Sequence, residues 1–183
     1  MLASALFAIE NSDVPATAAA DLQAGIIYGF TGGDKDVRAL MNECFAPDQQ
    51  LADDFTQFFA AIKSGDLDSV KSIVIADEER ALKDADLCLN DPKYQEVHDA
   101  YYYQQDLIKA AYKDDNWQLH AMKGIRGHMQ EIKDAAAAGS AAWEAGLAGD
   151  ADGFYEAGTY VGAIDHIVFT YWIEKMQQTA FLQ

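Results

Sequence analysis

The chain has 183 residues, of which 30 are Asp or Glu and 13 are Lys or Arg, so its formal net charge is −17 at pH 7. Half of the residues are hydrophobic and only three are proline, which is typical of a globular protein and not of a disordered acidic tail. This negative charge repels phosphate backbones and anionic lipid, and no apolar run reaches the roughly 18 residues of a transmembrane helix. We therefore expect no nucleic-acid partner and no membrane span.

The first nine residues are apolar and small. They resemble the second half of a secretory signal, with Ala3 and Ala5 or Leu6 and Ala8 as candidate small-x-small pairs. The basic segment that opens a signal is missing, so an apolar N-terminal helix is the alternative. We expect residues 1–12 to be a remnant of a secretory signal and residues 13–183 to form a single helical domain.

Apolar residues recur at helical spacing along most of the chain, so the sequence predicts helices. The first four are expected over residues 16–30, 37–45, 51–64 and 67–88. Pro47 separates the second from the third because proline lacks an amide donor. The acidic run at 77–79 marks a candidate break in the fourth. No segment alternates apolar and polar residues as a strand does, so we expect essentially no sheet.

The second half of the chain predicts three more helices. Asp91 as N-cap and Pro92 at the first helical position begin a helix that ends near residue 112. A long helix follows the polar turn at 113–116, and a last helix begins near 150–152. The expected inward face of the long helix contains Leu119, Met122, Met129, Ile132, Ala136, Trp143 and Leu147. The expected fold is an all-α, single-domain bundle of about seven helices.

The chain has two cysteines, Cys44 and Cys88. In a reducing compartment both would be small core residues. In an oxidising compartment they would pair and close a loop of about 45 residues, which contributes roughly 4 kcal/mol through chain entropy. Both fall on inward stripes of their predicted helices, so we expect one disulfide if the protein is secreted. No Cys-x-x-Cys motif is present, which disfavours zinc and thioredoxin-like chemistry.

Two segments share the pattern Ala-Gly-x-x-x-Gly, with Gly25 and Gly29 in the first and Gly158 and Gly162 in the second. Glycine inside a helix costs about 1 kcal/mol relative to alanine, so two such pairs indicate a compensating gain. Without a Cβ at i and i+4, two helix backbones can approach closely. We expect these glycines to form packing grooves on the first and last long helices, and contact between these two helices is one way to use the grooves.

The pattern Gly-Asp-x-Asp occurs at residues 33–36, 65–68 and 149–152, each time between two predicted helices. Helix capping explains this placement, because glycine ends a helix and aspartate accepts the first amide hydrogens of the next. Calcium binding is the alternative, but no copy continues into an EF-hand loop. We expect capping, no cofactor, and only weak, non-specific calcium binding by the acidic surface.

Asp165 and His166 are the strongest candidates for chemistry, because both lie in the apolar stretch 161–173. Asp165 shares a helix face with Val161 and Phe169, and a buried carboxylate without a partner is costly and can mark a site. Neighbouring helical residues point about 100° apart, so the two residues cannot act as a direct dyad. We expect hydrogen bonds to another helix to satisfy these buried polar groups.

No other catalytic or metal-binding pattern stands out. His120 and His128 are eight residues apart, about 12 Å along a helix, which is too far to share one metal ion. Neither has the Glu-x-x-His partner of di-metal bundles, and the nucleophile-elbow, Walker and dinucleotide motifs are absent. We therefore expect no catalytic residues, no metal site and no enzyme, with an active site at Asp165 and His166 as a weaker option.

Three consecutive tyrosines, Tyr101, Tyr102 and Tyr103, cover most of a helix circumference, so at least one ring should face outward. Tyrosine tolerates half-burial and is common at protein–protein contacts. The sequence thus suggests an aromatic interface, with ordinary packing in a tyrosine-rich bundle as the alternative.

Several short segments follow one another along the chain: Gly29-Phe30-Thr31-Gly32, Cys44, the segment 62–66, Cys88 and the segments 149–150 and 157–162. Their order resembles that of uncharacterised small secreted helical proteins of ciliated protozoa. The resemblance implies an acidic, cysteine-paired protein of the secretory pathway with a structural role, and it carries over no catalytic residue. We expect a secreted, non-enzymatic assembly subunit that contacts other proteins or itself. The alternative is a helical carrier whose glycine-rich helices and aromatic residues enclose a small hydrophobic ligand.

Overall fold

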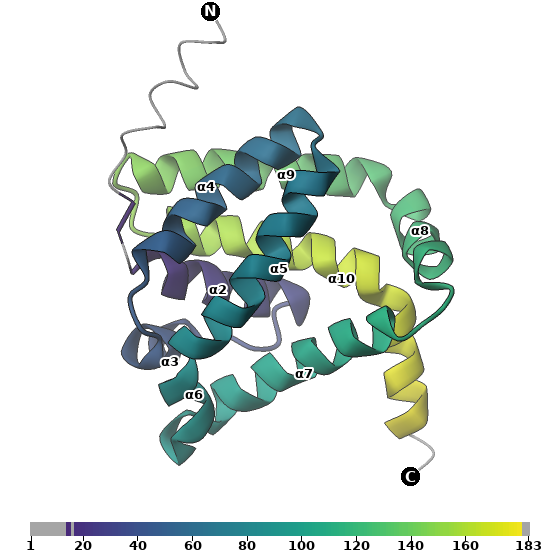
Figure 1. Cartoon of the computed structure of the whole chain (residues 1–183), viewed down its shortest axis with the longest axis horizontal. Coiled ribbons are helices and arrows are strands. Elements are labelled where there is room, and N and C mark those ends of the chain that lie inside the picture. The colour runs from purple at the N-terminus through teal and green to yellow at the C-terminus, as the bar shows by residue number, and fades with distance from the viewer. Residues whose placement is uncertain (1–13, 16, 181–183) are drawn as a thin grey trace, which may run out of the picture.

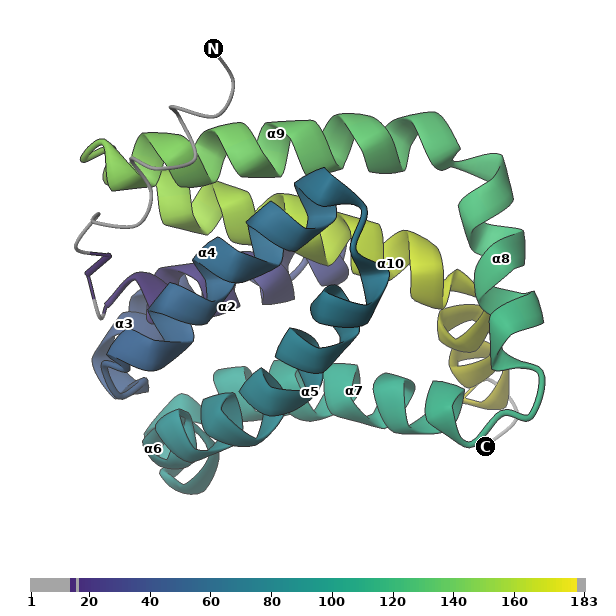
Figure 2. The same cartoon turned by 45° about the horizontal axis from the view of Figure 1, so that its top comes forward.

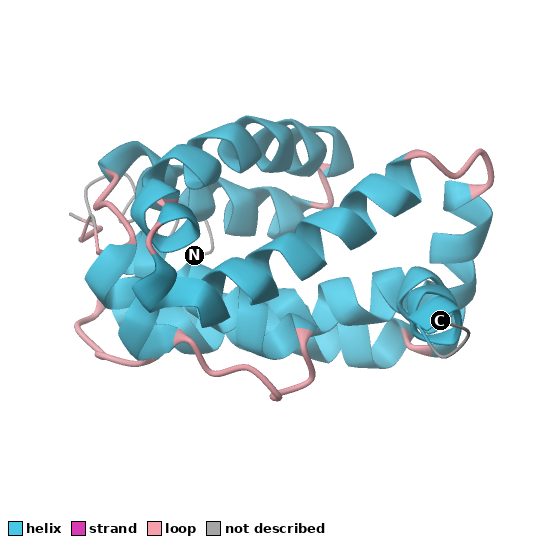
Figure 3. Cartoon of the chain, turned by 90° about the horizontal axis from the view of Figure 1, so that it is seen from below, coloured by secondary structure: helices cyan, strands magenta, loops and turns pink. Residues whose placement is uncertain are grey.

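The computed structural model describes residues 14, 15 and 17–180, and in this part of the chain it contains helices and no strand (Figure 1). Seen from below, short loops connect helices throughout (Figure 3). The α-helices are α2 (Ala18–Phe30), α3 (Arg38–Cys44), α4 (Gln49–Ser64), α5 (Leu67–Asp84), α6 (Asp86–Asn90), α7 (Gln95–Tyr112), α8 (Trp117–Gly127), α9 (Met129–Leu147) and α10 (Gly153–Ala180). The prediction of an all-α single domain is confirmed, and residues 1–12 lie outside the described residues.

The long helix α10 is the centre of the fold. It packs against α2, α9, α8 and α7, while the α4–α5 hairpin lies across one side of this assembly (Figure 2). Within the described residues, no helix combines the length and the apolar character needed to cross a membrane.

The structure brings the four helix glycines together where α2 crosses α10. A Cβ added to Gly25 would overlap the carbonyl oxygen of Tyr155, and one added to Gly158 would overlap that of Leu22. Gly29 and Gly162 repeat the arrangement one turn further along, so the two backbones are in direct contact. At these four glycines the two helices therefore leave no space between them for a ligand.

A disulfide between Cys44 and Cys88 closes the base of the α4–α5 hairpin, and this predicted pairing is confirmed. Beside it, the amide of Ala46 donates a hydrogen bond to the carbonyl oxygen of Asp84 at 2.8 Å. Arg80 on α5 is bonded to Asp54 on α4, which ties the two arms of the hairpin together.

Two helix breaks raise the number of α-helices in the described residues above the predicted seven. The prediction of a break at 77–79 is wrong, because α5 runs through this segment to Asp84. The break falls at Ala85, which lies outside the helical region at φ −84° and ψ 5°.

The prediction of one long helix through residue 128 is also wrong, because His128 takes φ −127° and ψ 21° and separates α8 from α9. Glycines at 124 and 127 weaken the helix before this point. The break lets α8 turn across α10, where Gly124 lies against the carbonyl oxygen of Ile167 (Figure 2).

Candidate functional site

Helix α8 differs in charge from the rest of the protein. Residues 116–130 contain no Asp or Glu, although acidic residues make up 30 of the 183 positions. The wider segment 109–133 holds five Lys or Arg against three Asp or Glu, a formal charge of +2, so the remainder of the chain carries −19. The end of the molecule at α8 is therefore a cationic region on an acidic protein.

The outer side of α8 is also apolar. Leu119 is 58% exposed and Met122 is 44% exposed, and both Lys123 and Arg126 are exposed as well. These four residues follow one another at i, i+3, i+4 and i+7, so they share one face of the helix. We call these four residues the α8 face.

This exposure corrects the prediction that Leu119, Met122 and Met129 point inward, since all three are among the most exposed large apolar residues. The physical reason is that α8 packs on α10 through its small residues. Ala121 is buried, and Gly124 touches the α10 backbone. The large side chains consequently point away from the core.

An open pocket of about 800 Å³ lies beside the N-terminal end of α8. Its lining residues come from the end of α7, the α7–α8 loop, α8 and the end of α10. They are Ala110, Lys113, Asp114, Asp115, Asn116, His120, Tyr171, Trp172, Lys175 and Met176.

Asp114 organises this pocket. Its Oδ2 lies 2.8 Å from Nδ1 of His120 and accepts a hydrogen bond from Nε1 of Trp172 at 3.2 Å. Its Oδ1 accepts a bond from the amide of Asn116 at 2.9 Å. The hydrogen bond from the Asn116 amide and the contact with His120 lower the pKa of Asp114 below its usual value. The His120 ring stacks on Tyr171 with the ring centroids 3.7 Å apart, so both α8 and the loop before it are fixed to α10.

The Asp114–His120 pair has the geometry by which a carboxylate orients an imidazole. Among the described lining residues of the pocket there is no Ser, Thr or Cys that this imidazole could activate. Sequence reasoning did not find the contact between Asp114 and Trp172, because the two residues are 58 positions apart and no spacing rule connects them. The contacts of Asp114 with His120 and Trp172 position α8 against α10.

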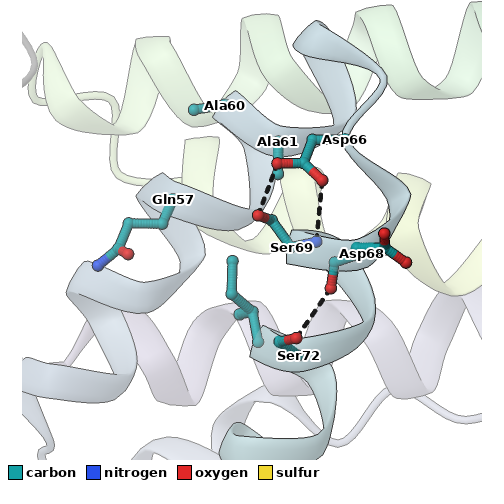
Figure 4. Close-up of a pocket in the computed structure, with 8 residues that line it drawn as sticks. Gln57, Ala60, Ala61, Asp66, Asp68, Ser69 and Ser72 are labelled. Atoms are coloured by element: carbon teal, nitrogen blue, oxygen red, sulfur yellow. Dashed lines mark hydrogen bonds between the residues drawn. The ribbon is translucent and has the colours of Figure 1, made fainter.

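A smaller pocket of about 440 Å³ lies between α4 and α5 (Figure 4). The polar groups there are used locally: Asp66 accepts hydrogen bonds from the amide and the hydroxyl of Ser69, and Ser72 donates to the carbonyl oxygen of Asp68. Gly65 has a φ of +74°, which ends the preceding helix. The capping function predicted for this Gly-Asp-x-Asp segment is confirmed.

Among the described residues, no group of three or more His, Cys, Asp or Glu side chains is arranged to hold a metal.

The three consecutive tyrosines do not form one surface. Tyr101 is buried, and Tyr103 is half-buried, which raises the pKa of its hydroxyl. Tyr102 is exposed and packs on the ring of His98, with the centroids 4.6 Å apart. One ring of the three therefore faces outward.

Asp165 and His166 point in different directions from the middle of α10. Nδ1 of His166 donates a hydrogen bond of 2.7 Å to the carbonyl oxygen of Phe30, at the end of α2. Asp165 has limited solvent exposure and makes no hydrogen bond or ion pair with another described residue, contrary to the expectation that both groups are satisfied. Desolvation alone raises the pKa of Asp165 to about 7.

An Asp165→Asn substitution is expected to stabilise the protein at pH 8 by an amount on the order of 2 kcal/mol, because the amide avoids the cost of a desolvated charge. The raised pKa in the folded state means that wild-type stability falls as pH rises from about 4 to 7, so the gain should vanish near pH 4. Urea unfolding at pH 4, 6 and 8 measures this difference. Glu174→Gln, an exposed change on the same helix, should show no such trend, and an equal gain at pH 4 would contradict the prediction.

Comparison with known proteins finds no family model, no curated protein and no solved structure that matches the chain.

Proposed function

We propose that this chain is a secreted, non-enzymatic helical protein that works by binding another protein through the α8 face. The observation that carries the proposal is the coincidence of exposed Leu119 and Met122 with Lys123 and Arg126 on one face of a rigidly held helix. Large exposed apolar residues that cluster with cations favour a binding surface.

The contacts around α8 also support binding. Trp117 is 45% exposed at the start of α8, and Trp, Met and Arg are enriched at the centres of protein interfaces. Because the Asp114–His120–Trp172 contacts fix α8 to α10, little conformational freedom is lost when a partner docks. The neighbouring pocket of about 800 Å³ offers room for an anchoring side chain of the partner. A partner of complementary chemistry is an acidic surface with exposed apolar residues.

The Cys44–Cys88 disulfide supports secretion. Disulfides persist in oxidising compartments and are rare in reducing ones, where thiols are kept free. The apolar residues at the start of the sequence, which resemble part of a secretory signal, also support secretion.

To test the proposal, the tagged protein is recovered from the cells that make it and its particle mass is measured by light scattering after gel filtration. Wild-type protein is expected in a particle larger than its own 20.1 kDa. Leu119→Asp with Met122→Asp should return it to 20.1 kDa, because two charges would be desolvated at the contact. The matched control places two aspartates at Ala137 and Ala141, both exposed on α9, and should leave the large particle intact. A wild-type monomer, or a large particle that survives the α8 changes, would refute the proposal.

The helical carrier is the second candidate, and the pocket lined by Tyr171, Trp172 and Met176 is the observation that favours it. Native mass spectrometry of the recovered protein would then show a bound small molecule. A mass equal to that of the chain alone would remove this candidate.

A further inference from the structure

A second exposed apolar area lies at the end of α5 and on α6. Leu87 is 48% exposed, and Leu82 at the end of α5 is exposed as well. Asp86 and Asp91 are exposed at the two ends of α6, and Asn90 lies between them in sequence and is exposed too. Residues 83–93 contain three acidic and two basic residues, but Asp84 is buried and Lys93 is paired with Glu43, which leaves Asp86 and Asp91 against Lys83 among the exposed charges. We call Leu82, Asp86, Leu87, Asn90 and Asp91 the α6 face.

The α6 face and the α8 face have opposite charge and lie at opposite ends of the molecule. Figures 1 and 2 both place α6 at one end and α8 at the other, with the length of α7 between them. Each face combines two exposed aliphatic or thioether side chains with two charged groups of one sign. Because the two faces of one molecule are this far apart, they cannot cover each other within a single copy.

We propose that the α8 face of one copy binds the α6 face of a second copy, so that the chain assembles head to tail; this inference rests on the proposed binding function of α8. Lys123 and Arg126 would meet acidic groups of α6, and Leu119 and Met122 would pack on its exposed leucines. Such a contact is heterologous, since it joins two different surfaces of the same chain. Repetition of the contact forms a ring when the rotation closes and a filament when it does not.

The charge distribution favours a second copy as the occupant. A chain with a net charge of −17 repels itself at long range, whereas the segment 109–133 with its charge of +2 attracts the acidic remainder. The contact is therefore weakest at very low ionic strength. Raising the salt concentration from about 10 mM to about 150 mM shortens the Debye length from roughly 30 Å to roughly 8 Å, which removes the long-range repulsion first.

The test uses two charge-reversed variants of the full chain in sedimentation velocity experiments. One carries Lys123→Glu and Arg126→Glu, which reverse the α8 face, and the other carries Asp86→Lys and Asn90→Lys, which reverse the α6 face. Asp91 is kept, because its side chain accepts a hydrogen bond from the amide of Lys93 and caps the next helix. All four altered side chains are exposed, and circular dichroism verifies that each variant is folded.

Wild-type protein at about 150 mM salt is expected to show an average mass that rises with concentration above 20.1 kDa. Each variant alone should associate at least about tenfold more weakly, because like charges then face each other. An equimolar mixture of the two variants should recover association, because the reversed α8 face complements the reversed α6 face and the two native faces complement each other. Emission of the exposed Trp117 should shift to the blue in the wild type and in the mixture, and in neither variant alone.

Two results would overturn the inference. In the first, the mixture stays as monomeric as its components. In the second, the wild-type protein is monomeric at every salt concentration, while the particle recovered from cells contains a different protein that the Leu119 and Met122 changes release. The second result leaves the proposed function intact. If the wild-type protein forms no complex that depends on the α8 face, both the inference and the proposed function are wrong.

Discussion

Substitution of Gly158 by alanine is expected to lower the free energy of unfolding by about 3 kcal/mol, the upper end of the usual cost of overpacking. The added methyl group would overlap the carbonyl oxygen of Leu22, a backbone atom that cannot rotate away. The two helices would have to separate along their whole contact. For a chain of this length we expect the melting temperature to fall by about 6 to 12 °C.

The matched control is Gly127→Ala, because Gly127 is also helical and a Cβ there would meet no atom within 4 Å. That change should leave stability unchanged or raise it by up to about 1 kcal/mol, since alanine is the better helix former. Differential scanning calorimetry of the two variants and of Gly162→Ala provides the measurement. Equal melting temperatures for Gly158→Ala and Gly127→Ala would show that the α2–α10 backbones are further apart than described.

Removal of the disulfide by Cys44→Ala with Cys88→Ala is expected to cost about 4 kcal/mol, because the unfolded chain regains the freedom of a loop that the bridge had closed. The two residues are 44 positions apart, and the loop between them contains the whole α4–α5 hairpin. The folded structure should persist, since Phe59 on α4 still packs on Trp143 of α9 with the ring centroids 5.4 Å apart.

Guanidinium unfolding of the double variant measures the loss, and hydrogen exchange locates it. Amides in α3 and α6, which the bridge joins, should exchange faster than those in α2 and α10. Wild-type protein kept reduced should match the variant in stability, which controls for the packing of the two sulfur atoms. If the double variant is as stable as the oxidised wild type, the unfolded chain is already compact around the hairpin base without the bridge.

Local sequence rules were sufficient for most of the helices. The spacing of apolar residues predicted the segments that became α2, α3, α4, α7 and α10, and Asp66 and Asp91 cap helices as their positions suggested. The rules were wrong at Ala85 and His128, because a break between two helical segments with good propensity depends on what each segment packs against. At His128 the deciding contact is Gly124 on the α10 backbone.

The candidate site could largely not be predicted from the sequence. Periodicity assigned Leu119 and Met122 to the core, because a helical stripe of apolar residues usually faces inward. The signal that could have found the site was the absence of Asp and Glu over residues 116–130 in so acidic a chain. The tie between Asp114, His120 and Trp172 had no local signal, since it joins residues from three elements.

The sequence by itself determined the helical class, the glycine pairs and the two cysteines available for pairing, because each of these depends on properties of neighbouring residues along the chain. Tertiary structure alone decided that Gly25 meets Gly158, that Cys44 and Cys88 close a hairpin, and that α8 turns its large side chains outward. These outcomes depend on which helix faces compete for the limited space around α10. On α8 the small residues pack against α10, and so its apolar and cationic face is exposed and available to a partner.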